Sequence, residues 1–204
     1  MTFVLYPTES HGHWVCTATV DSPTEVKLFD SVGSFTEIQI SLLLQIAKVY
    51  STGGILKIRK ESVQQQVGNT DCGCFAVVFA TEICQGRNPC TASFDQGQMR
   101  VHLYKCLQRG EMSAFPQVSK ALETIPRPKS QVFTYPINCY CRLPDEYDTD
   151  MIQCDSCNKW VHYACAGISE ATKDFSCSVC MGRGRHVAGK PKEFSVRFPA
   201  KKSK

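Results

Sequence analysis

The sequence predicts an α+β domain followed by a small module that folds around metal ions, and three observations lead to this expectation. Residues 2–109 alternate short apolar runs with longer segments whose apolar residues recur at helical spacing. Cysteine and histidine residues are concentrated in pairs between Cys139 and Cys180. The intervening residues 116–137 carry four prolines without a long apolar stripe, which is typical of a semi-rigid linker.

Strands are expected at residues 2–6, 13–20, 26–31 and 55–59. Each run is short and rich in β-branched or aromatic residues, and the turn-forming segment PTESHG separates the first two runs. These strands would supply the sheet of the first domain.

Helices are expected at three places. Residues 35–50 carry a helical apolar stripe that ends at a Gly-Gly pair, and that stripe must face a core. The apolar run CFAVVFATEIC predicts a buried helix that starts at or just after Cys72, and a last amphipathic helix covers residues 96–109. The residues of the first stripe are Ile38, Leu42, Ile46 and Val49.

Four positions of the first domain fit the chemistry of a thiol nucleophile: His13, Asp30, Gln66 and Cys72. A thiol attacks a carbonyl as thiolate, so it needs a nearby imidazole, a group that orients the imidazole, and donors for the oxyanion that follows. Cys72 would lie at a helix N-terminus, where the helix dipole favours a thiolate. His13 and Asp30 lie at strand ends, and Gln66 lies on the loop that leads to Cys72.

Three of these positions lie in short sequence motifs: HW at 13–14, FDS at 29–31 and DCG at 71–73. Gln66 lies between the second and third motifs. In that order they resemble the ubiquitin-like-protein-specific proteases, which process and remove SUMO-type modifiers. The resemblance covers residues 2–116 and implies a papain-like cysteine protease domain. It implies His13 as base, Asp30 as its orienting partner, Gln66 as oxyanion donor and Cys72 as nucleophile, with Trp14 lining a tunnel for the modifier's diglycine end.

The sequence departs from that family before His13, where only 12 residues stand. Family members usually have a longer stretch there, which builds a helical half of the domain. Two alternatives follow: a truncated peptidase that cleaves a ubiquitin-like modifier, or a catalytically dead remnant that acts only as an interaction protein. The missing half would leave apolar surface exposed.

The stretch from Cys139 to Cys180 contains four pairs of soft ligands, each pair separated by one or two residues. Two such pairs supply the four ligands of a tetrahedral zinc ion, so the eight ligands predict two zinc ions. A segment this short cannot bury a sufficient core, so zinc must supply its folding free energy, on the order of 10 kcal/mol or more per ion. The ligands are Cys139, Cys141, Cys154, Cys157, His162, Cys165, Cys177 and Cys180.

The order of these ligands, with histidine fifth and Trp160 two residues before His162, resembles the PHD finger family. That resemblance implies an interleaved cross-brace, in which the first and third pairs hold one zinc ion and the second and fourth pairs hold the other. The alternative is the RING family of ubiquitin and SUMO ligase modules, which normally places histidine fourth. A disulfide framework is a further alternative, but paired thiols around a histidine suit metal better.

Many PHD fingers bind a histone tail that adds a strand to the finger while a lysine enters a pocket. The resemblance implies Trp160 and Met151 as walls of that pocket, since an indole face and a thioether suit a methylated ammonium group. Asp155, Asp145 and Glu146 would meet basic side chains of the peptide. There are two alternatives to recognition of a methylated lysine: the finger binds an unmodified histone tail, or it binds no histone.

Charge differs between the segments of the chain. The finger, residues 139–180, carries 3 basic and 7 acidic side chains, whereas residues 181–204 carry 8 basic and 1 acidic. We therefore expect a cationic peptide as partner of the finger, and nucleic acid or an import receptor as partner of the tail. No apolar run approaches the roughly 20 residues that span a bilayer, so no membrane partner is expected.

The predicted organisation is a partial protease domain at 1–115, a linker at 116–137, a finger at 138–181 and a disordered basic tail at 182–204. A ubiquitin-like modifier and a histone tail are the expected partners. The expected localisation is the nucleus.

Overall fold

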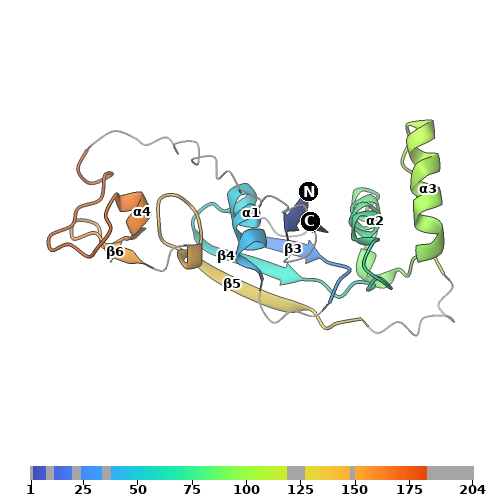
Figure 1. The fold of residues 1–204 in the computed structure, drawn as a ribbon, viewed down its shortest axis with the longest axis horizontal. Helices are drawn as coiled ribbons and strands as arrows, with labels where there is room; N and C mark the ends of the chain where they lie inside the picture. Colours follow the sequence, from blue (N-terminus) through green and yellow to red (C-terminus); the bar gives the residue numbers. More distant parts are fainter. Residues whose placement is uncertain are drawn as a thin grey trace, which may run out of the picture.

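The computed structural model describes residues 2–7, 12–19, 24–33, 38–118, 127–147 and 150–182, with residues 2–7 described as backbone. The basic tail therefore lies outside the described residues. The described part of the chain is elongated (Figure 1). The cysteine-rich finger lies at one end, a mixed sheet lies in the middle, and helices α2 (Cys72–Cys84) and α3 (Gln96–Arg109) lie at the other end.

Five strands form the sheet in the order β1-β2-β3-β4-β5. Antiparallel pairing joins every neighbouring pair except β3 and β4, which are parallel. A parallel pair needs a crossover, and helix α1 supplies it between β3 and β4. The strands are β1 (Thr2–Pro7), β2 (Gly12–Ala18), β3 (Glu25–Phe29), β4 (Gly54–Lys60) and β5 (Gln131–Ile137).

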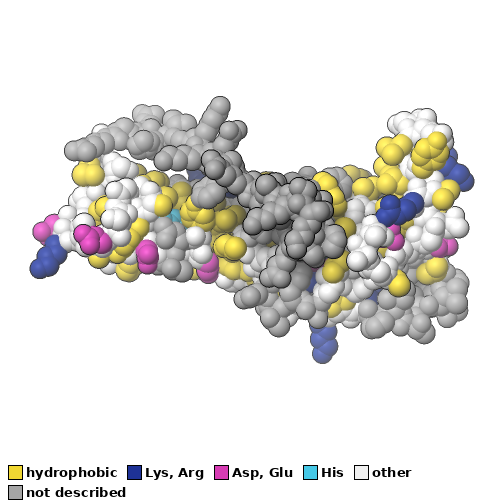
Figure 2. Space-filling model, viewed as in Figure 1, with side chains coloured by type: hydrophobic (Ala, Val, Ile, Leu, Met, Phe, Trp, Pro, Cys, Tyr) yellow, Lys and Arg dark blue, Asp and Glu magenta, His cyan; other side chains and the backbone are white. Residues whose placement is uncertain are grey.

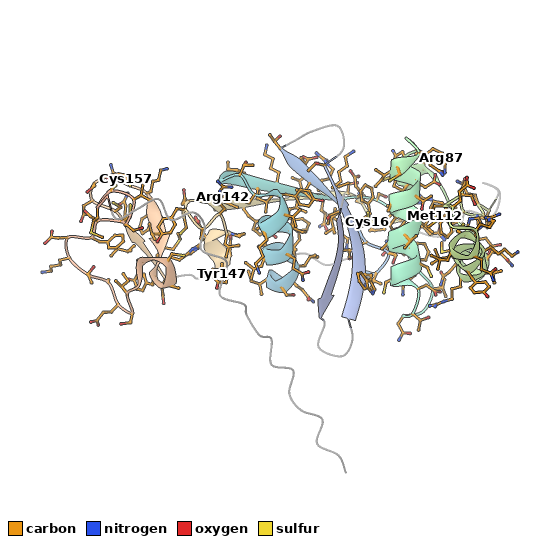
Figure 3. The ribbon with its side chains drawn as sticks, turned by 90° about the horizontal axis from the view of Figure 1, so that it is seen from above. Cys16, Arg87, Met112, Arg142, Tyr147 and Cys157 are labelled. Atoms are coloured by element: carbon orange, nitrogen blue, oxygen red, sulfur yellow. The ribbon has the colours of Figure 1, made fainter. Side chains whose placement is uncertain are left out.

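Helix α1 (Ile40–Tyr50) covers one face of the sheet, and helix α2 (Cys72–Cys84) packs on the other. Neighbouring strand residues point to opposite faces, so Val15 joins the core under α1 while Cys16 joins the core under α2. Figure 3 shows α1 and α2 on either side of the blue strands, with Cys16 on the side of α2. Every side chain from Phe75 to Glu82 in α2 is buried except Val77, as the continuous apolar run predicts.

Helix α3 (Gln96–Arg109) lies beyond α2 and buries only Met99 and Cys106. Val101, Tyr104 and Leu107 of this helix are exposed, which leaves an apolar stripe on its outer side. The 3-10 turn η1 (Pro89–Thr91) lies between α2 and α3 along the chain. The strands and helices expected in residues 2–109 are therefore confirmed, with boundaries that differ by a few residues, and the mixed α/β class is confirmed with them. The papain-like assignment stays a prediction.

Strand β5 differs from the sequence expectation, since it lies inside the proposed linker 116–137. Its seven residues pair along the whole of β4. Alternate side chains Phe133, Tyr135 and Ile137 pack against the core under α1, which gives the segment a buried face. Pro136 is tolerated because β5 is an edge strand of the described sheet. The finger therefore follows directly from a strand of the sheet.

The finger contains the 3-10 turn η3 (Asp145–Tyr147), strands β6 (Met151–Gln153) and β7 (Trp160–His162), and the short helix α4 (Tyr163–Ala166). Leu143, just before η3, packs against the core under α1. Figure 3 shows Arg142 and Tyr147 at the junction between the sheet and the finger, and Cys157 within the finger. Among the described helices, none is long and apolar enough to cross a membrane.

Candidate functional site

Two clusters of metal ligands form in the finger, in the interleaved order that the sequence predicts. Ligand atoms within each cluster lie within 4.8 Å of one another. One cluster consists of Cys139, Cys141, His162 and Cys165, and the other of Cys154, Cys157, Cys177 and Cys180.

The spacing of the ligand atoms fits tetrahedral zinc. A tetrahedron with zinc to sulfur bonds of about 2.3 Å has edges of about 3.8 Å. The Sγ atoms of Cys154 and Cys180 are 3.9 Å apart, as are those of Cys157 and Cys177. The two clusters therefore bind two zinc ions, one through four thiolates and one through three thiolates and an imidazole.

His162 is oriented by its second ring nitrogen. Its Nδ1 lies 3.4 Å from Cys141 Sγ and 3.9 Å from Cys165 Sγ, so Nδ1 is the ring nitrogen that would bind the ion. Nε2 donates a hydrogen bond to the carbonyl oxygen of Pro144 at 3.2 Å. A zinc-binding histidine usually donates its other N–H to such an acceptor, which fixes the tautomer and the ring orientation.

Backbone donors support the thiolates as well. The backbone N–H of Cys177 donates to Cys154 Sγ at 3.3 Å, and that of Leu143 donates to Cys141 Sγ at 3.4 Å. The tight turns that present these ligands place Arg142 and Asn158 in the left-handed region, with φ of 64° and 57°. Asparagine tolerates that conformation better than most residues, which suits the turn between β6 and β7.

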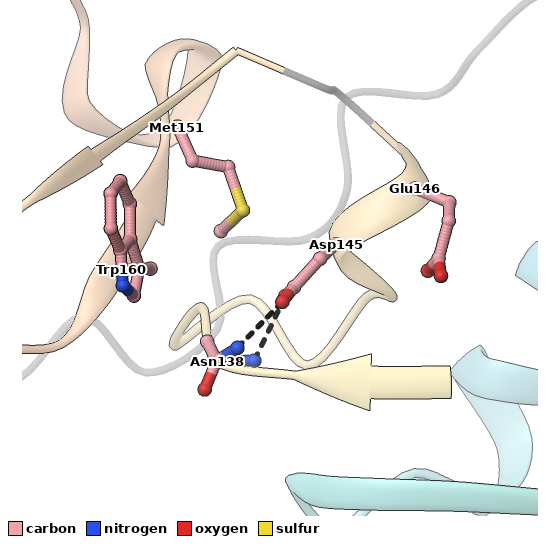
Figure 4. A pocket seen from close by; sticks show the side chains of 5 residues that line it. All are labelled: Asn138, Asp145, Glu146, Met151 and Trp160. Carbon is pink, nitrogen blue, oxygen red and sulfur yellow. Dashed lines mark hydrogen bonds between the residues drawn. The ribbon is translucent and has the colours of Figure 1, made fainter. Parts of the chain in front are cut away.

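A hollow of about 460 Å³ opens beside the short sheet of the finger. Met151 from β6 and Trp160 from β7 lie next to each other because their strands pair antiparallel (Figure 4). Asp145 and Glu146 from η3 line the other side together with Asn138, which follows β5. Four of the five predicted peptide-binding residues therefore share one hollow.

Asp155, the fifth predicted peptide-binding residue, lies elsewhere. It is exposed on the turn after β6 and does not line the hollow. Asn138 was not predicted as a functional residue, although it binds Asp145 through two hydrogen bonds. The residues are seven positions apart on different elements, so no local pattern in the sequence marks their contact.

In the first domain, the structure brings His13 and Asp30 together. His13 Nε2 lies 2.7 Å from Asp30 Oδ1, and the backbone N–H of Val32 donates to the same oxygen at 2.8 Å. Both side chains are buried. Burial opposes the charged form of His13, but its interactions with Asp30 and then Cys72 outweigh burial and raise the pKa of His13 above its usual value.

Cys72 is the first residue of α2 and is half-buried beside His13. Asp71 just before it is held by Gln96, whose Nε2 donates at 2.6 Å, and by Arg100, whose Nε donates at 2.8 Å. The exposed ring of Trp14 lies against Gly73, where a side chain would meet the indole at 3.4 Å. Gly73 of the DCG motif therefore permits close packing of Trp14 on the start of α2.

Gln66 is held at the end of β3. Its backbone N–H donates to the carbonyl oxygen of Ser31 at 2.8 Å, and its side-chain oxygen accepts from Ser31 Oγ at 3.0 Å. Its amide nitrogen donates to the carbonyl oxygen of Gly68 at 2.9 Å. The proposed oxyanion donor is therefore bound to the backbone of its own loop.

Lys60 is a residue of this site that sequence reasoning missed. It is 2% exposed, donates to the carbonyl oxygen of Gly33 at 2.7 Å, and lies 3.9 Å from Asp30 Oδ2. Burial lowers the pKa of Lys60, and the charge of Asp30 partly offsets that effect. In β4, Leu56, Ile58 and Lys60 are the buried alternate residues. The sequence signal for Lys60 is therefore its place two residues after Ile58 in a strand whose alternate residues are apolar.

Comparison with known proteins identifies the class of the metal-binding module: residues 139–180 match the family described as PHD-finger. The module is therefore a PHD finger, in agreement with the ligand order, and the match favours this family over the RING alternative. No solved structure matches the chain.

Curated relatives match the chain over a segment of similar length. The lysine-specific demethylase phf2 of Danio rerio is 46% identical over 37 residues, which is 18% of this chain and 4% of that protein. The lysine-specific demethylase 5B of Gallus gallus is 42% identical over 48 residues, 22% of this chain and 3% of that protein. The histone lysine demethylase PHF8 of Danio rerio is 46% identical over 35 residues, 17% of this chain and 3% of that protein. This chain thus spans only a few per cent of their length.

Proposed function

We propose that the PHD finger of this chain reads the amino-terminal tail of a histone, and that the protein works in the nucleus. The hollow beside β6 carries the proposal, because it combines an indole and a thioether with two carboxylates. A lysine side chain has the same two parts, an apolar stem and a cationic head.

The backbone next to the hollow supports binding of an extended peptide. Strand β6 pairs with β7 along one edge, and no other described strand pairs with its second edge. An extended peptide adds to such an edge through main-chain hydrogen bonds, while pockets for side chains give specificity. Acidic side chains also lie along the finger on the face shown in Figure 2, where they attract a basic tail.

The relatives support the same interpretation. Their names describe lysine demethylases, one of them a histone lysine demethylase. We propose only the tail-reading role for this chain, because the matched segments are of the size of the finger alone. Demethylation is not proposed.

A calorimetric titration tests the proposal on the full chain loaded with zinc. Peptides with the sequence of the amino-terminal tail of the third core histone should bind with saturation, and Trp160→Ala should weaken binding at least tenfold, which is about 1.4 kcal/mol. Tyr104→Ala removes an exposed aromatic ring on α3 and serves as control. Absence of saturable binding to peptides in every methylation state would exclude the tail-reading role.

The His13, Asp30 and Cys72 arrangement supports a second candidate function, cleavage of a ubiquitin-like modifier. His13 would take the proton of Cys72, and Asp30 would hold the imidazole in place. The thiolate would attack the terminal carbonyl of the modifier to form a thioester, and the leaving amine would take the proton from His13. Water would then hydrolyse the thioester. Gln66 would have to leave Gly68 to stabilise the oxyanion.

Covalent labelling tests this second candidate. Ubiquitin-like modifiers that carry a C-terminal electrophile should label the native chain, and Cys72→Ala should abolish the labelling. No labelling by any modifier, with the sheet shown to be folded by circular dichroism, would make the first domain a binding remnant.

A further inference from the structure

The carboxylate of Asp145 is fixed in the hollow of the finger before any ligand arrives. The backbone N–H of Asn138 donates to Asp145 Oδ1 at 3.0 Å, and Asn138 Nδ2 donates to Oδ2 at 2.6 Å. Each carboxylate oxygen accepts more than one hydrogen bond, so both keep acceptor capacity for a ligand. Figure 4 shows this carboxylate directed toward Asn138, across the hollow from Trp160 and Met151, with Glu146 farther out.

The opposite side of the hollow suits methyl groups. Trp160 is 44% exposed and presents its ring, and Met151 is half-buried beside it. An indole ring attracts a cation placed over its face, and a thioether makes soft contacts with methyl groups. Among the described residues, Trp160 is the one aromatic side chain that lines the hollow, so this part of the cage has one aromatic wall and one hydrogen-bonding wall.

The geometry points to a lysine with one or two methyl groups as the preferred ligand of this hollow, an inference that rests on the proposed tail-reading function. The methyl groups would contact Trp160 and Met151, and a remaining N–H would donate to Asp145. The ligand class is a secondary or tertiary ammonium group on a basic peptide.

Charge alone does not discriminate among the methylation states, because each lysine state carries one positive charge. Trimethyl-lysine has no N–H, so it would displace water from the Asp145 carboxylate without donating a hydrogen bond in return, and the two oxygens would keep only their bonds from Asn138. Unmodified lysine donates three hydrogen bonds but brings no methyl groups to the apolar wall. Mono- and dimethyl-lysine do both: their methyl groups contact Trp160 and Met151, and their remaining N–H groups donate to Asp145.

Glu146 adds negative potential at the outer side of the hollow. Within the described residues it makes no hydrogen bond or ion pair, in contrast to Asp145. An exposed carboxylate that is not held in place gives less specificity than a fixed one, because its side chain must be ordered on binding. Discrimination among methylation states is therefore assigned to Asp145.

A series of four peptides tests the inference on the full zinc-loaded chain. The peptides share the amino-terminal sequence of the third core histone and carry zero, one, two or three methyl groups on the first lysine. We expect the mono- or dimethyl peptide to bind about three- to tenfold more tightly than the trimethyl peptide, the net effect of one typical hydrogen bond. Tightest binding of the trimethyl or the unmodified peptide would overturn the inference but leave tail reading intact. No binding of any peptide would instead reject the tail-reading function itself.

Variants separate the role of Asp145 from general charge. Asp145→Asn should bring the affinity ratio of dimethyl to trimethyl peptide close to one. Glu170→Gln removes the same charge from an exposed position of the finger outside the hollow, and should leave the ratio unchanged. Asn138→Ala removes the side-chain donor to Oδ2 and keeps the backbone N–H bond to Oδ1, so it loosens the carboxylate and should reduce the ratio even if Asp145→Asn fails to fold. An unchanged ratio in a folded Asp145→Asn or in Asn138→Ala would overturn the assignment.

Discussion

Three groups lie around the buried carboxylate of Asp30. His13 and Val32 donate to Oδ1, whereas Oδ2 has no hydrogen-bond partner and lies 3.9 Å from the Lys60 ammonium. The Lys60 ammonium therefore places a positive charge beside the buried oxygen that lacks a hydrogen bond, while the other oxygen holds His13 in place.

The raised pKa of His13 predicts a pH dependence of stability. Its pKa in the folded protein lies above the usual value of 6.5, so protonation of His13 favours the folded state. This contribution is fully present below the unfolded pKa and is lost as pH rises through the folded pKa. The difference in free energy of unfolding between the native chain and His13→Gln should therefore shrink as pH rises above the usual pKa of 6.5.

Urea denaturation at several pH values measures that difference, and comparison of the two proteins at each pH cancels the effects of the zinc ligands. A difference that stays constant or grows with pH would show that Asp30 and Cys72 do not favour the protonated imidazole.

Single residues were predictable where a local pattern marks them. The zinc ligands follow from the spacing of cysteine pairs, and Cys72 follows from its place before an apolar run. Lys60 and Asn138 were not predictable in the same way, because strand pairing and the packing of η3 bring them to their partners. Such contacts depend on the fold rather than on neighbours in the sequence.

Among the elements, β5 was missed because its composition argues against a strand. Pro136 and the prolines before it suggested a linker, and its pairing partner β4 is far away in the sequence. The alternation of Phe133, Tyr135 and Ile137 was the signal in favour of a strand. Helices α2 and α3 were easier to predict, since each depends on a local pattern of apolar residues.

The buried end of β5 gives a test of this element. Ile137 is 4% exposed and packs in the core under α1, so Ile137→Ala should lower the free energy of unfolding by about 2–5 kcal/mol. Val132 on the same strand is 49% exposed, and Val132→Ala should change stability by about 0.5 kcal/mol or less. Denaturant titration of both variants makes the comparison. Equal, small effects would mean that β5 does not pack on the sheet.

The two parts of the chain owe their stability to different interactions, apolar packing in the first domain and zinc binding in the finger. The sheet and its helices have two apolar cores, whereas the finger has a small core built largely around its cysteine ligands. Zinc supplies the folding free energy of such a module, about 10–16 kcal/mol for a structural site at neutral pH. The finger and the sheet should therefore respond differently to loss of metal.

Chelation of zinc should unfold the finger and leave the sheet folded. Hydrogen exchange measured by mass spectrometry should show loss of protection in β6 and β7 but not in β2 and β3. Loss of protection in all of these strands together would mean that the sheet depends on the finger for its stability. Full protection of β6 and β7 in the zinc-free protein would contradict the role of the metal in folding.

The chain carries only two tryptophans, and each reports one proposed site. Trp160 lines the hollow of the finger, and Trp14 lies against the start of α2 beside Cys72. The measurement that tests the central claim most directly is therefore an NMR titration of the full chain with a methylated histone tail peptide, observing both indole N–H signals. We predict a saturable shift of the Trp160 signal with the Trp14 signal unchanged. A Trp160 signal that stays in place throughout the titration would contradict the tail-reading role of the finger.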